Sequence, residues 1–109
     1  MSQDWIREDF LCYVLLYAAS ADLVIGEEEE DYIKGQVGDE AYAAIKKEFD
    51  HDNDAQRIHK IMNFSEGEDF DKEYCDIVLN DIDDLFLSDG NYSHWEKNIA
   101  RALKRLMNS

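Results

Sequence analysis

The 109-residue chain contains no proline and only five glycines. Proline interrupts helices, and glycine is a common break between strands, so their scarcity favours long helices over a fold built from many turns. The longest apolar stretch, residues 10–21, falls short of the roughly 20 residues that a membrane-spanning helix needs, and acidic residues precede it. We therefore expect a cytoplasmic protein with no membrane insertion.

Cysteine and catalytic motifs are equally scarce. Cys12 and Cys75 lie in apolar stretches and form no CxxC pair or zinc-binding spacing, so we expect reduced thiols in the core. The chain has no glycine-rich phosphate loop and no serine or cysteine nucleophile motif. These absences leave nucleophilic catalysis without support.

Acidic residues dominate the charge. The chain has 26 acidic and 11 basic residues, a net charge of −15, with 45% hydrophobic residues. So apolar a composition indicates a folded chain, and we expect one domain over residues 1–109 with a core in about residues 10–107. Residues 1–38 and 65–92 are the most acidic, whereas residues 93–109 are basic. Such a surface disfavours direct binding of nucleic acid and favours a basic protein partner or metal cations.

Apolar residues recur at helical spacing along the chain, which predicts an all-α, compact bundle of about six helices. The first helix is apolar nearly all round from Phe10, so it should be enclosed by the others. The fifth should pack against it, and Asp39 should cap the third. The expected helices span about residues 4–21, 27–38, 39–49, 54–64, 70–88 and 93–107.

Three histidines are candidates for metal or acid–base chemistry. His51 stands between Asp50 and Asp52, and we interpret residues 51–53 as an exposed acidic loop. His59 is expected to be a packed or surface residue, and His94 an exposed one.

Residues 82–103 repeat the sequence pattern of residues 15–36. Each copy has an apolar stretch, an aspartate, a turn and a glutamate seven residues after the aspartate: Asp22 with Glu29, and Asp89 with Glu96. In the second copy Ser93 and Glu96 have the spacing of a capping box, so a purely structural role in joining two helices is sufficient.

The second copy also matches the back half of a calcium-binding EF-hand loop. Its front half does not match, because Leu85 and Leu87 stand at the positions of ligand carboxylates. A site for Ca²⁺ or Mg²⁺ therefore requires the two turns to face each other and bring four acids together. These candidate ligands are Asp22, Glu29, Asp89 and Glu96.

The same residues resemble a known family. Ala21-Asp22 followed by Ile25 and Glu29, with Ser88-Asp89-Gly90, Tyr92, Ser93 and Glu96 near the end, is similar to the TerB-like fold of tellurite-resistance proteins over about residues 10–107. The resemblance implies an all-α fold of two similar helical halves, with a metal site at the four acids of the two turns.

Several functions are compatible with these residues. The first is a non-enzymatic module of the TerB-like kind, serving protein interaction or stress response and responding to a divalent cation. The second is a metal-dependent hydrolase with paired carboxylates, although the Glu-x-x-His pairs of helical di-metal proteins are absent. The third is an acidic mimic of nucleic acid. The sequence leaves the partner, the metal and the oligomeric state open.

Overall fold

A computed structural model describes residues 6–20, 27–67, 70–87, 98 and 101–105, and the regular secondary structure in these ranges is helical throughout. Residues 98 and 101–105 belong to helical backbone near the C-terminus. The expected all-α bundle is therefore confirmed. The five helices that the structure bounds are α1 (Arg7–Ala19), α2 (Glu27–Val37), α3 (Asp39–His51), α4 (Asp54–Ser65) and α5 (Lys72–Leu87).

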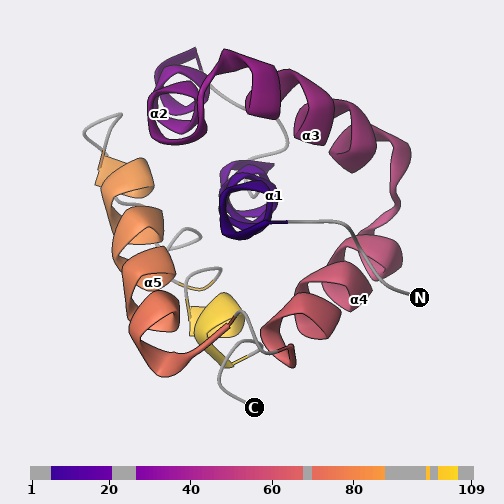
Figure 1. Ribbon diagram of the computed structural model, residues 1–109. Coiled ribbons are helices and arrows are strands. Elements are labelled where there is room, and N and C mark those ends of the chain that lie inside the picture. The colour runs from indigo at the N-terminus through magenta and orange to yellow at the C-terminus, as the bar shows by residue number, and fades with distance from the viewer. Residues whose placement is uncertain (1–5, 21–26, 68–69, 88–97, 99–100, 106–109) are drawn as a thin grey trace.

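Helix α1 runs through the centre of the bundle. Figure 1 shows α2, α3, α4 and α5 arranged around it, and α1 packs against each of these four helices. Every residue from Phe10 to Ala19 is buried except Tyr17, which is partly buried. A helix that is apolar on all sides must be surrounded to be kept from water, which is why this segment occupies the middle.

Aromatic rings fill the space between α1 and its neighbours. The Phe10 ring stacks on Phe64 with 4.5 Å between centroids and meets the edge of Phe70 at 5.3 Å. On another side, Tyr13 and Phe49 form a T-shaped pair at 5.3 Å. Such pairs add about 0.5–1.5 kcal/mol each to the stabilisation from burial. They connect α1 to α4, to the turn before α5 and to α3.

The surrounding helices present their apolar residues inward, largely as the periodicity predicts. Ile77 is the exception, because half of its surface is exposed although it lies among apolar residues of α5. Near the C-terminus Leu103 is buried while its neighbours are exposed, so this segment is amphipathic as expected. The buried inward residues are Ile33 in α2, Tyr42, Ile45 and Phe49 in α3, Ile61 in α4, and Tyr74, Val78, Ile82 and Leu85 in α5.

Local signals explain the helix boundaries. Gly38 separates α2 from α3 with a φ of 91°, a left-handed conformation that glycine adopts at little cost. Gly38 is also the N-cap of α3, so the prediction that Asp39 caps this helix is wrong, and Asp39 is its first residue. At α4, Asn53 is the cap, and its side chain and that of Gln56 each accept the other's backbone N–H at 2.8 Å.

Both cysteines are free thiols in the core, as predicted. Burial, with a smaller contribution from the charge of Asp9, raises the pKa of Cys12 to about 12, so this thiol is not a reactive thiolate at neutral pH. Among the described residues, no helix combines the length and the apolar character needed to cross a membrane.

Candidate functional site

The four acids of the repeated turns were the candidate metal ligands, and the structure describes one of them. Glu29 lies in the first turn of α2 and is 4% exposed. Asp22, Asp89 and Glu96 lie outside the described residues, so their meeting at one place stays a prediction. Within the described ranges, no group of three or more His, Cys, Asp or Glu side chains is placed to hold a metal ion. Glu29 alone is far short of the six to eight oxygens that calcium requires.

A partly buried polar cluster lies between α1, α3 and α4. Asp52 is only 8% exposed, so the prediction of an exposed loop over residues 51–53 is wrong at this position. The Tyr13 hydroxyl donates a hydrogen bond to Asp52 Oδ2 at 2.6 Å. Lys60 Nζ lies 2.6 Å from the same oxygen and 2.7 Å from Glu48 Oε2. The cluster of Tyr13, Glu48, Asp52 and Lys60 thus connects three helices.

The charges in this cluster stabilise one another. Burial acts to raise the pKa of Asp52, but hydrogen bonds from Lys60 and Tyr13 and the charge of Lys60 outweigh it and lower that pKa. Burial acts to lower the pKa of Lys60, but its hydrogen bonds to Asp52 and Glu48 outweigh this effect and raise that pKa. Burial and the bond to Asp52 raise the pKa of Tyr13. The lysine stays charged and the tyrosine stays protonated, so neither has the shift that a nucleophile or general base requires.

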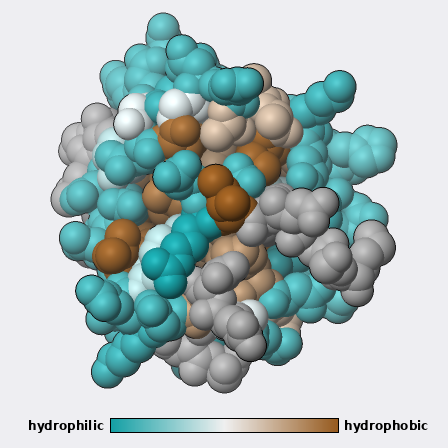
Figure 2. All heavy atoms as spheres, viewed as in Figure 1, coloured by the Kyte–Doolittle hydropathy of each residue, from teal (hydrophilic) through white to brown (hydrophobic). Residues whose placement is uncertain are grey.

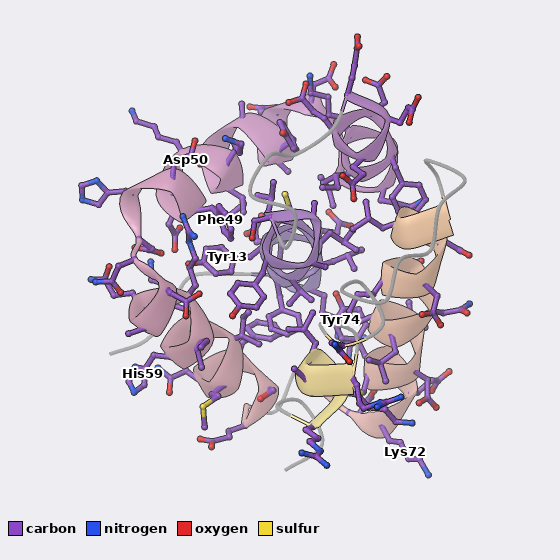
Figure 3. The ribbon with its side chains drawn as sticks, turned by 180° about the vertical axis from the view of Figure 1, so that it is seen from behind. Tyr13, Phe49, Asp50, His59, Lys72 and Tyr74 are labelled. Carbon is purple, nitrogen blue, oxygen red and sulfur yellow. The ribbon has the colours of Figure 1, made fainter. Side chains whose placement is uncertain are left out.

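Arg57 supports the same junction from α4. Its guanidinium lies over the Phe49 ring, 3.8 Å from the centroid, and Nε and Nη2 donate to the Phe49 carbonyl oxygen at 3.1 and 2.8 Å. This carbonyl is near the end of α3, where helical carbonyls lose their usual partners. Figure 3 shows Tyr13 and Phe49 pointing into the bundle, and Asp50 and His59 pointing away from it.

The histidines make no site in the described part of the chain. His51 ends α3 and His59 lies in α4, and both are exposed. His51 is exposed as predicted but belongs to α3 and not to a loop, and His59 takes the surface position of the two that were expected. His94 lies outside the described residues.

Helix α5 is strongly acidic, with five acidic residues and one basic residue, the same balance as in α2. Glu73, Asp76, Asp83 and Asp84 are exposed and Asp81 is partly buried, while Lys72 is the one basic residue of this helix. Burial and the charge of Asp84 raise the pKa of Asp81, a sign that these carboxylates repel each other. Figure 2 shows hydrophilic residues over most of the rim of the bundle.

A shallow pocket of about 290 Å³ borders this helix on the side of the C-terminal helical residues. It is lined by Leu79 and Asp83 from α5 and by Arg101 and Lys104. The basic residues near the C-terminus therefore lie beside one edge of the acidic helix, and they leave its outward side uncovered by described residues.

Comparison of the chain with protein-family models, with curated proteins and with solved structures finds no match. The candidate site therefore rests on the geometry and charge described above.

The ion pair and hydrogen bond of Asp52 lead to a prediction about stability in acid. Asp52→Asn keeps the shape of the side chain and removes its charge, so we expect the free energy of unfolding at pH 7 to fall by about 1–3 kcal/mol. The folded pKa of Asp52 is lower than its unfolded value of about 3.9. Its contribution is therefore complete above that unfolded value and is lost as the pH falls through the folded pKa. Urea unfolding of both proteins from pH 7 downward should show their difference shrinking below about pH 4.

Asp50→Asn is the matched control. Asp50 pairs with Lys46 at 2.6 Å, but its side chain is 57% exposed. An exposed pair four residues apart in a helix contributes about 0.5 kcal/mol or less. Equal losses in the two variants would show that burial of Asp52 contributes nothing to stability.

Proposed function

We propose that this chain is a non-enzymatic helical module of the TerB-like kind whose acidic surface binds a basic protein partner. We further propose that it acts in the cytoplasm, where buried thiols such as Cys12 and Cys75 remain reduced. The observation that carries the proposal is the accumulation of exposed carboxylates on α5 in a chain with a net charge of −15.

The distribution of ion pairs supports this proposal. On α2, α3 and α4, three lysines pair with acids: Lys34 with Glu30 at 3.4 Å, Lys46 with Asp50, and Lys60 with Glu48 and Asp52. Glu27, Glu28 and Asp31 at the start of α2 join no ion pair within the described ranges. No ion pair joins Glu73, Asp76, Asp81 or Asp84 to another residue in the described ranges. Carboxylates left together in this way produce a negative potential that attracts cationic partners and accelerates their association.

In this proposal the cluster of Tyr13, Glu48, Asp52 and Lys60 has a structural role. Its lysine and tyrosine have pKa values raised above their ordinary ranges, so they stay protonated at neutral pH. Their bonds tie helices together instead of presenting a reactive atom.

The test uses a helical peptide of about 18 residues, long enough to form a helix, with a leucine stripe flanked by lysines. We call it the basic peptide, and its control has the same composition in scrambled order. Fluorescence anisotropy should show at least tenfold tighter binding of the basic peptide, because only the ordered sequence presents its charges and leucines on one face. Raising the salt concentration should weaken this binding, since exposed charges are screened. Equal affinities for the two peptides would contradict the proposal.

A second part of the proposal concerns a divalent cation. The observation in its favour is the position of Glu29, a residue that is 4% exposed at the start of α2. We propose that Asp22, Asp89 and Glu96 join Glu29 in holding Ca²⁺ or Mg²⁺, as the TerB-like resemblance implies.

Thermal unfolding tests the cation. At a concentration a hundredfold above the dissociation constant, calcium or magnesium adds about 2.7 kcal/mol to stability, which raises the melting temperature. Asp89→Ala should abolish the rise, whereas Asp71→Ala, outside the two turns, should retain it. A melting curve of the parent protein that does not move in millimolar calcium or magnesium would rule out the cation.

A further inference from the structure

The outward side of α5 carries a regular pattern in addition to its charge. Residues 73, 77, 80 and 84 follow one another at intervals of three or four positions, so they form one strip along the helix. All four are exposed. We call Glu73, Ile77, Asn80 and Asp84 the outer strip.

Ile77 is the unusual member of this strip. It is 50% exposed, and only one other large hydrophobic residue of the described chain, Ile6, is so far exposed. Asp76 and Asp81 lie one and four positions from Ile77 on α5, so carboxylates border it. An apolar side chain set among carboxylates that join no ion pair within the described ranges offers a partner an apolar contact together with attractive charges.

The spacing of the acids decides what can cover the strip. Glu73 and Asp84 are eleven residues apart, which is about 16 Å along a helix. Calcium binds oxygens at about 2.3–2.6 Å, so one ion cannot serve both ends of the strip. Several cationic side chains, distributed along a partner of comparable length, can serve them together.

We propose that the outer strip of α5 is the docking surface for a basic amphipathic helix of a partner protein. This inference rests on the proposed function and locates the partner-binding surface on α5. Lysines or arginines of the partner lie against Glu73, Asp76 and Asp84, and an apolar residue between them covers Ile77. A helix fits because its side-chain ridges repeat at the same three- and four-residue intervals as the strip. An extended peptide would need an open sheet edge, and the described chain has no strand.

A second copy of the chain fits the outer strip less well than a basic helix of another protein. Its own basic residues Arg101, Lys104 and Arg105 are exposed, which gives some complementarity to the strip. Each copy carries a net charge of −15, however, and like net charges oppose association of the whole molecules.

The experiment compares two double variants of the full chain. Ile77→Ala/Asp84→Lys changes the outer strip. Ile6→Ala/Glu66→Lys is the matched control, because Ile6 is 58% exposed and Glu66 is an exposed residue at the end of α4. Both variants lose the same apolar group and gain the same charge, and each new lysine lies near a helix C-terminus, where a cation is tolerated.

We expect the strip variant to weaken binding of the basic peptide at least tenfold and the control variant to change it less than twofold. Addition of the basic peptide should shift the amide resonances of residues 72–84 most strongly in NMR spectra. Circular dichroism establishes that both variants remain helical, and the NMR map of the parent protein tests the proposal independently of any variant.

Three outcomes would overturn the inference. If the basic peptide keeps its preference over the scrambled one but both variants bind it equally, the partner docks elsewhere and only the proposed function survives. If neither peptide is preferred, the proposed function fails as well. If the parent chain forms a dimer in sedimentation experiments that only the strip variant disrupts, the occupant of the strip is a second copy.

Discussion

The burial of α1 on every side is the constraint on which the rest of this structure depends. Because its residues from Phe10 to Ala19 are apolar in all directions, the other helices must surround it and turn their own apolar residues inward. Their polar residues are then left on the outside. In a chain with 26 acidic and 11 basic residues, this arrangement produces a negatively charged exterior, and α2 and α5 each have five acidic residues against one basic residue.

The polar cluster around Asp52 lies inside this arrangement and adds directional contacts to it. Hydrophobic burial has little directional preference, so it leaves the angle between α1 and the junction of α3 with α4 loosely specified. The hydrogen bond from Tyr13 to Asp52 and the ion pair of Lys60 with Asp52 have defined geometry. They fix the position of this junction against the central helix. Lys60 of α4 is used in this way, whereas Glu73, Asp76, Asp81 and Asp84 of α5 join no ion pair within the described ranges.

Much of the fold could be predicted because helix periodicity and helix ends are local properties. The start of α2 after residue 26, its end before Gly38 and the inward positions of Tyr42, Ile45 and Phe49 follow from spacing alone. Two details could not be predicted. Burial of Asp52 depends on Tyr13 and Lys60, which are distant in sequence. Ile77 is apolar but lies on the outward side of α5. The TerB-like kinship and the metal site stay predictions, since the turns that carry them lie outside the described residues.

Native-state hydrogen exchange of the full chain tests the enclosure of α1 most directly. Amides in fully enclosed segments exchange only when the whole molecule unfolds, whereas exposed or weakly packed segments exchange through smaller openings. We expect the amides of residues 10–16 to be the slowest in the chain, with an opening free energy equal to that of global unfolding. Exchange of these amides at the rate of those in α2, through an opening that leaves the other helices intact, would contradict the enclosure of α1.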